Sequence, residues 1–192
     1  MILYGSDTSP YVRRIRIYCL RHDITLDYRK LDIFSEEGRA ILHQHNPARK
    51  LPFLLADDQA VLDSNVIARY LQQKFSLPHL NWAQENLLTI INACNDSLVE
   101  LLLCQRSEFD IQDDKLFFNL QRGRIAETLR VLDQSCHETV FLNCEYLQIS
   151  LYCLLDWIRF RNLFDLTPYT ALEQFYDQWQ PQDEARLTDP RA

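Results

Sequence analysis

The sequence predicts an α/β domain followed by an all-helical domain. Over residues 1–75, short strand-forming runs (2–4, 26–31, 52–55 and 59–62) alternate with helical runs (10–22, 35–45 and 63–75) in the order βαβαββα. From residue 83 onward only helical periodicity is found. We therefore expect domains at 1–75 and 83–192, joined by a linker at 76–82 that contains Pro78.

A polar turn joins the first strand to the first helix. Ile2, Leu3 and Tyr4 form the strand, and Ser9-Pro10 stands directly before the amphipathic run. Serine is favoured at a helix N-cap, and proline suits the first turn because no N–H is needed there. The free N–H groups and the helix dipole favour an anion at such an end, so a thiolate or a phosphate could bind.

A proline begins the third strand-forming run, in Lys50-Leu51-Pro52-Phe53. Proline has no N–H to donate, so it is tolerated at the first strand position or at a sheet edge. The Leu51-Pro52 bond is either trans, like most such bonds, or cis, in which case it turns the Leu51 backbone outward toward a ligand. With the Ser9-Pro10 turn, this run fits a thioredoxin-like layout whose ligand site lies where the two turns meet.

Helical periodicity in the second half fills 83–107, 113–135, 146–162 and 168–179. The apolar residues of the first of these runs recur at three to four positions: Leu87, Leu88, Ile91, Leu98, Leu101 and Leu102. This spacing places them along one side of a helix and predicts a helical bundle.

Composition limits the classes of partner. With 192 residues, 47% of them hydrophobic and 24% charged, the chain can bury a globular core. Its net charge of −7 gives no long-range attraction for nucleic acid or an anionic membrane. Arg13, Arg14, Arg16 and Arg21 make the first helix locally basic, which suits a small anionic ligand or a solvated face. No apolar run approaches the roughly 18–20 residues of a membrane span, and no signal peptide begins the chain, so we expect a cytoplasmic protein.

Cysteines, histidines and glycines exclude other kinds of site. The six cysteines form no C-x-x-C pair or zinc spacing, which predicts buried thiols in a reducing compartment. His43 and His45 are too close in sequence to share a helical face, and the other histidines are isolated, so we expect no metal. Three glycines are too few for a Gly-rich phosphate loop.

Three blocks together resemble the signature of the cytosolic glutathione S-transferase superfamily. They are Ser9-Pro10-Tyr11-Val12-Arg13, Asn46-Pro47-Ala48-Arg49-Lys50-Leu51-Pro52 and Leu62-Asp63-Ser64-Asn65-Val66-Ile67-Ala68-Arg69-Tyr70-Leu71. Asp156-Trp157-Ile158-Arg159-Phe160-Arg161 is similar to the end of the family's buried C-terminal helix. The likeness is closest to bacterial members with a Ser-Pro-Phe or Ser-Pro-Tyr turn. It implies the family's two-domain fold, glutathione as co-substrate, an electrophilic second substrate and a homodimer.

The resemblance implies that Ser9 activates the glutathione thiol. A free thiol with a pKa near 8.5 is only about 3% ionised at pH 7, and lowering that pKa by about two units takes roughly 2.7 kcal/mol. A hydroxyl that donates to the sulfur, with the N–H groups of the first turn, could supply this. Alternatively Ser9 only caps the helix, and Ser6, Thr8 or Tyr4 contacts the thiol.

The other two blocks would hold the peptide part of glutathione. The resemblance implies that Leu51, beside Pro52, pairs its backbone with the cysteinyl unit and that Lys50 lies toward the glycyl carboxylate. Asp63 and Ser64 would bind the γ-glutamyl group. Arg49 stands where the family commonly has glycine, so either arginine holds a conformation easy for glycine or the loop differs.

The same turn excludes one kind of chemistry. A dithiol redox enzyme carries Cys-Pro-Tyr-Cys there, whereas this chain has Ser9-Pro10-Tyr11-Val12. Conjugation of glutathione to an electrophile remains, as does reduction of a peroxide or disulfide by bound glutathione. The alternative is a binding or regulatory protein of this fold without transferase activity.

Overall fold

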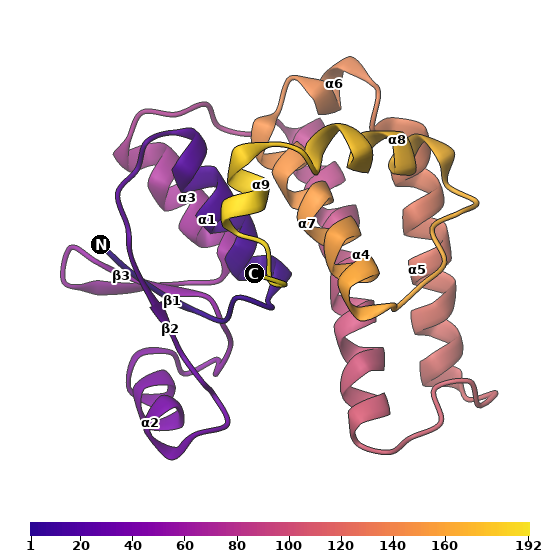
Figure 1. Cartoon of the computed structure of the whole chain (residues 1–192), viewed down its shortest axis with the longest axis horizontal. Coiled ribbons are helices and arrows are strands. Elements are labelled where there is room, and N and C mark those ends of the chain that lie inside the picture. The colour runs from indigo at the N-terminus through magenta and orange to yellow at the C-terminus, as the bar shows by residue number, and fades with distance from the viewer. The chain divides into compact units, whose positions relative to one another are not determined.

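A computed structural model describes all 192 residues in two compact units. One comprises Met1–His79 with Pro181–Ala192, and the other comprises Leu80–Gln180. The predicted fold class is confirmed, since the first unit is a mixed sheet with helices and the second is helical (Figure 1). The sequence placed all of 83–192 in the second domain, whereas the structure groups the last twelve residues with the first.

The first unit is built on a four-stranded sheet. Its strands are β1 (Ile2–Gly5), β2 (Asp27–Lys30), β3 (Phe53–Ala56) and β4 (Gln59–Leu62), in the order β2-β1-β3-β4. β1 is parallel to β2 and antiparallel to β3, which is antiparallel to β4. Leu3, Phe53 and Leu54 are fully buried, so the core lies on the two central strands.

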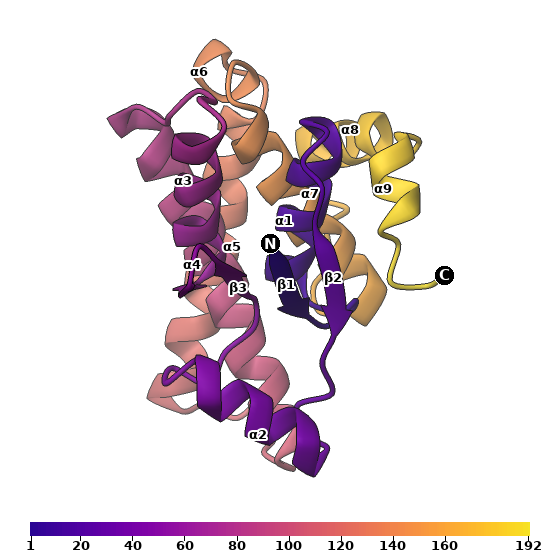
Figure 2. The ribbon, with the colours of Figure 1, turned by 90° about the vertical axis from the view of Figure 1, so that its left-hand side faces the viewer.

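Three helices cover this sheet: α1 (Pro10–Arg21), α2 (Glu36–His45) and α3 (Ser64–Lys74). α1 and α3 pack side by side, and α2 lies apart from them (Figures 1 and 2). Ser35 caps α2 by accepting a hydrogen bond from the Gly38 N–H at 3.0 Å. All seven elements predicted for this half are present.

The short helix α9 (Asp183–Leu187) packs against α1 of the same unit. Arg13 is 3% exposed and donates through Nη2 to the Ala185 carbonyl at 2.8 Å and through Nε to Thr188 Oγ1 at 3.1 Å. Arg21 donates to Gln182 Oε1 at 2.7 Å. The basic residues of α1 therefore do not form a solvated face, because part of their charge holds the end of the chain.

The second unit is a bundle of α4 (Trp82–Arg106), α5 (Leu116–Ser135), α6 (Thr139–Leu142), α7 (Glu145–Arg161) and α8 (Thr170–Trp179). α4 and α5 lie side by side, and α7 is the most buried helix (Figure 1). The Asp133 carboxylate of α5 caps α8 by accepting from the Ala171 and Leu172 N–H groups. Sequence analysis missed α6 and α9, which are too short to show a helical period.

α4 is long and apolar enough to pass as a membrane span by length and composition, which sequence analysis did not detect. It packs against α5, α6 and α7, and 44% of its most apolar window is buried, so it is a core helix of the bundle.

Five of the six cysteines are buried and all are free thiols, as expected. Burial raises the pKa of Cys19 and of Cys94 to about 12.

Candidate functional site

Three loops of the first unit meet at one end of the sheet. Tyr4 of β1 pairs with Phe53 of β3, which pairs with Leu62 of β4. The turn that follows β1, the loop that precedes β3 and the residue that follows β4 therefore all leave the sheet at the same end. They carry Ser9, Lys50-Leu51-Pro52 and Asp63-Ser64, which are the residues that sequence analysis selected.

Ser9 is the N-cap of α1. Its backbone is extended, with φ −89° and ψ 123°, and its Oγ accepts a hydrogen bond from the Val12 N–H at 3.4 Å. Pro10 occupies the first helical turn, which contains no acidic side chain. The half-buried hydroxyl can still donate its proton, because a hydroxyl has one donor and two acceptor positions.

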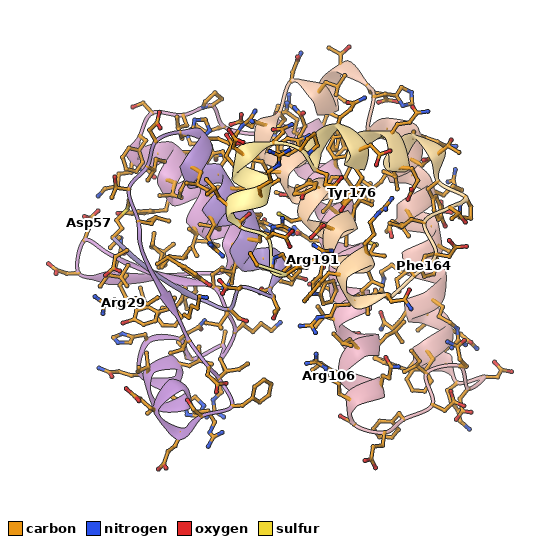
Figure 3. All side chains as sticks on the ribbon, viewed as in Figure 1. Arg29, Asp57, Arg106, Phe164, Tyr176 and Arg191 are labelled. Atoms are coloured by element: carbon orange, nitrogen blue, oxygen red, sulfur yellow. The ribbon has the colours of Figure 1, made fainter.

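The alternative hydroxyls of the turn have other contacts. Ser6 Oγ and Thr8 Oγ1 are hydrogen bonded to each other at 3.2 Å. The Tyr4 ring stacks on Phe53 with centroids 4.8 Å apart, and its hydroxyl accepts from Arg29 at 3.4 Å. Tyr4 is thus engaged with its neighbouring strands, and Arg29 lies at the surface of β2 (Figure 3).

The loop before β3 is held by a buried asparagine. Asn46 is 1% exposed, donates through Nδ2 to the Lys50 carbonyl at 2.6 Å and accepts from the Ala48 N–H at 2.9 Å. Arg49 has a φ of 54°, so arginine does hold the left-handed conformation that glycine adopts easily. The Leu51-Pro52 peptide bond is cis. Lys50 is exposed and forms no ion pair within the chain.

The third part of the site is the start of α3. Asp63 caps this helix by accepting from the Asn65 N–H at 2.8 Å, with a φ of 70° and a ψ of 141°. A residue other than glycine rarely adopts this conformation, and backbone strain of this kind clusters at functional sites. Ser64 is buried, while Asp63 is exposed. Arg14 of α1 donates to Asn65 Oδ1 at 3.4 Å, which links the starts of α1 and α3.

Asp7, which sequence analysis did not select, joins the Ser9 turn to two elements. Its carboxylate accepts from Arg16 of α1 at 2.9 Å, from Tyr28 of β2 at 2.9 Å and from Lys30 at 2.6 Å. Burial raises the pKa of Asp7, but the hydrogen bonds from Lys30 and Tyr28 and the charges of Arg16 and Lys30 outweigh it, so the pKa lies below its usual value. Tyr28 and Lys30 are two residues apart on one strand and so lie on the same face of the sheet. This spacing is the feature of the sequence from which they could have been predicted as joint partners of a carboxylate.

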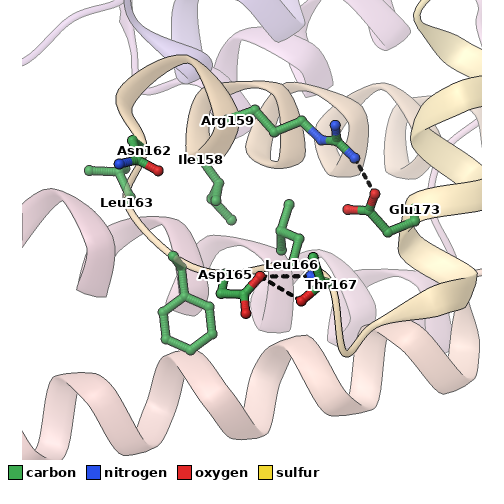
Figure 4. A pocket seen from close by; sticks show the side chains of 9 residues that line it. Ile158, Arg159, Asn162, Leu163, Asp165, Leu166, Thr167 and Glu173 are labelled. Atoms are coloured by element: carbon green, nitrogen blue, oxygen red, sulfur yellow. Dashed lines mark hydrogen bonds and ion pairs between the residues drawn. The ribbon is translucent and has the colours of Figure 1, made fainter.

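An open pocket of about 570 Å³ lies elsewhere, in the helical unit (Figure 4). It is lined by the end of α7, the loop that follows and α8, and it contains none of the selected residues. Arg159 and Glu173 form an ion pair across it, and Asp165 accepts from Thr167 at its edge. Its charged groups are therefore largely paired with each other.

No group of three or more His, Cys, Asp or Glu side chains in the chain is arranged to hold a metal ion.

Comparison with known proteins identifies the N-terminal domain. Residues 3–79 match the model of the glutathione S-transferase N-terminal domain. Curated relatives include a probable maleylacetoacetate isomerase of Caenorhabditis elegans, 32% identical over 72 residues, and the uncharacterised GST-like protein YibF of Escherichia coli K12, 36% identical over 74 residues. Each alignment covers 38% of this chain and only about a third of the relative (34% and 35%).

The fold likeness extends over the whole chain. A glutathione S-transferase of Methylobacillus flagellatus KT, solved with glutathione bound, superimposes with a TM-score of 0.83 at 23% identity and covers 98% of both chains. A glutathione S-transferase of Anopheles dirus species B gives a TM-score of 0.84 at 16% identity, covering 100% of this chain and 94% of that one. Residues 3–79 thus match the glutathione S-transferase N-terminal domain, and the whole chain has the fold of the glutathione S-transferase structures compared.

Proposed function

We propose that the chain binds glutathione at the end of the sheet where its three loops meet, and that Ser9 stabilises the thiolate for attack on an electrophile. The observation that carries this proposal is the register of the sheet, which brings the start of α1, the cis Leu51-Pro52 loop and the strained Asp63 to one place. The bound glutathione of the Methylobacillus structure supports the choice of ligand.

Each part of the site would take a different part of glutathione. The N–H groups at the start of α1, with the Ser9 hydroxyl, favour a negative sulfur. The backbone of Leu51 would pair with the cysteinyl unit as an added strand does, and the unpaired Lys50 would lie toward the glycyl carboxylate. Asp63 would accept from the γ-glutamyl ammonium, and the α3 start at Ser64 would receive the γ-glutamyl carboxylate.

The second substrate is an electrophile to which the thiolate adds. Conjugation and glutathione-dependent isomerisation share this first step, and the relative named as a probable maleylacetoacetate isomerase favours isomerisation as the second candidate. In isomerisation, addition of the thiolate forms a C–S bond and turns the double bond into a single bond that can rotate. Elimination of the thiolate then breaks the C–S bond and re-forms the double bond, so no glutathione is consumed. The free thiols also fit a reducing compartment, and we propose a cytoplasmic location.

The test compares two serine caps. Ser9→Ala removes the cap of α1 and Ser35→Ala removes that of α2, so each should cost about 0.5–2 kcal/mol of stability. Only Ser9→Ala should raise the pKa of bound glutathione, by about one to two pH units, and lower turnover of a generic aryl halide at least about tenfold. Glutathione affinity, measured by calorimetry, should change by less than about fivefold.

Two outcomes would contradict the proposal at different points. Unchanged turnover and an unchanged thiol pKa in Ser9→Ala would move the role to Ser6, Thr8 or Tyr4. Glutathione binding by the wild type without turnover of any electrophile would instead identify a binding or regulatory protein. Absence of binding and of thermal stabilisation at millimolar glutathione would exclude the site as a whole.

A further inference from the structure

The carboxylate of Asp7 links the Ser9 turn to two other elements of its unit. Residues 6–9 connect β1 to α1, and within them Asp7 contacts α1 through Arg16 and β2 through Tyr28 and Lys30. The Arg16 guanidinium also lies over the Tyr28 ring, 4.3 Å from its centre. Two of the partners of Asp7, Arg16 and Tyr28, therefore contact each other, and with Asp7 and Lys30 they form one cluster of side chains.

The position of this cluster follows from the parallel register of β1 and β2. Gly5, the last residue of β1, pairs with Lys30, so the end of β2 lies beside the start of the turn. Tyr28 lies two residues earlier on the same face of β2. Arg16 lies on α1, in the second turn of the helix that Ser9 caps. Asp7 thus fixes the turn from the strand on one side and from the helix on the other.

The charges of the cluster also affect the electrostatic potential at the start of α1. A carboxylate two residues from Ser9 would disfavour a thiolate at the start of α1, but Arg16 and Lys30 neutralise it. The side chains of Asp7 and Arg16 are 27% and 20% exposed, whereas that of Lys30 is 75% exposed. Arg16 is therefore the partner whose charge solvent screens least.

We propose that Asp7 is a positioning residue that holds the Ser9 turn in place and that, together with Arg16, sets the electrostatic field at the thiolate. The effect on the thiolate rests on the proposed function, but the effect on the turn does not. Asp7 touches neither substrate nor reacting atoms in this assignment, and it acts through the placement of Ser9 and through charge.

The first test measures the turn without any ligand. The Ser9 N–H donates to the Ser6 carbonyl at 3.0 Å, so its hydrogen exchange reports whether the turn is intact. Asp7→Asn should accelerate exchange at Ser9 by about tenfold or more relative to core amides of β3. Asp57→Asn is the matched control, because Asp57 accepts from Tyr70 and Lys74 at the β3–β4 turn, the opposite end of the sheet (Figure 3).

The second test uses the sign of the charge. Asp7→Asn should lower the pKa of bound glutathione by about half a pH unit, because it removes a negative charge, and Arg16→Gln should raise it by a similar amount. Turnover should fall in both variants, because both loosen the turn. A turn that acts only as structure would give no opposite pKa shifts.

The outcomes separate this inference from the proposed function. Unchanged exchange at Ser9 in Asp7→Asn would overturn the positioning role, whether or not glutathione binds. Thiol pKa shifts of the same sign in both variants would overturn the electrostatic role. Should Asp7→Asn fail to fold, Lys30→Gln removes the most exposed partner and should still accelerate exchange at Ser9, by a smaller factor. Absence of glutathione binding by the wild type would reject the proposed function and leave the exchange result standing.

Discussion

The hydrogen bonds of Arg13 should contribute much of the free energy that holds the C-terminal segment, residues 181–192, against α1. Its guanidinium is 3% exposed and donates to the Ala185 carbonyl and to Thr188 Oγ1, at 2.8 and 3.1 Å. We choose Arg13→Met, which preserves most of the volume and removes both donors, and Thr188→Val, which removes the hydroxyl that accepts from Arg13 and donates to the Glu184 carbonyl. The pair forms a double-mutant cycle about a single hydrogen bond.

The magnitude follows from the burial of these groups. A hydrogen bond from a charged donor contributes about 1.5–3 kcal/mol, and a buried carbonyl left without its donor costs about 1–3 kcal/mol. Arg13→Met recovers part of this lost free energy, because no charged guanidinium has to be desolvated when the variant folds. We therefore expect Arg13→Met to cost about 2–4 kcal/mol and Thr188→Val about 1–2 kcal/mol. The shared bond should appear as a coupling energy of about 1–2 kcal/mol.

Urea unfolding at pH 7 measures each free energy, and hydrogen exchange at Ala185 and Thr188 shows whether the segment detaches before the unit unfolds. Accelerated exchange confined to 181–192 would indicate local detachment. Additive effects, within about 0.3–0.5 kcal/mol, would refute the reasoning, because the two side chains would then not stabilise the protein through each other.

Four further predictions can be checked separately. Gly123→Ala in α5 should stabilise the protein by about 0.5–1 kcal/mol in urea unfolding, because nothing lies within 4 Å of the added Cβ. Gly5→Ala should destabilise it by about 1–3 kcal/mol, because the added Cβ would overlap Val12. Equal effects of the two substitutions would contradict this reasoning. Asp63→Ala should weaken glutathione binding by about 1.5–3 kcal/mol in calorimetry, and unchanged affinity would exclude the contact. The pKa of Asp7 is lowered in the folded state, so its carboxylate stabilises the protein fully above the ordinary pKa of 3.8. This contribution is lost as the pH falls through the lowered pKa of the folded state. In acid titrations, the difference in unfolding free energy between wild type and Asp7→Asn should therefore shrink below about pH 4. Light scattering at micromolar concentration should give about twice the 22.8 kDa chain mass, also in high salt, because Val66 and Phe75 of the first unit are exposed apolar side chains that a second copy would cover. A monomeric mass would contradict the dimer.

The first half of the chain could be predicted from local signals. The Ser9-Pro10 pair marks the start of α1 because capping depends on residues within one helical turn. The left-handed conformation of Arg49 was one of two alternatives, and its neighbours in sequence did not decide between them. The buried Asn46 that holds this loop looks like an ordinary turn residue until its contact with the Lys50 carbonyl is known.

Non-local contacts were the ones that could not be predicted. Arg13 and Thr188 are 175 residues apart, and no pattern along the chain links them. The basic residues of the first helix therefore suggested a small anionic ligand or a solvated face, although Arg13 is buried against α9 and Arg16 is paired with Asp7. The second domain was extended to residue 192 for the same reason, because five helical residues after Pro181 give no sign of the unit to which they pack.

The two units differ in how far sequence determines their details, and the difference has a physical cause. In the first unit, residues of the proposed site also shape the fold: Ser9 begins α1, Leu51-Pro52 leads into β3, and Asp63 holds a backbone conformation that restricts residue choice. In the helical unit, α4 and α7 need only apolar residues at helical spacing, which many sequences supply. The family model that matches residues 3–79 describes the N-terminal domain alone, and over the whole chain the likeness to the structures compared lies in the fold, at 23% identity or less. The motifs that point to glutathione in the proposed function all lie within residues 3–79, and no comparable motif of this sequence points to a second substrate.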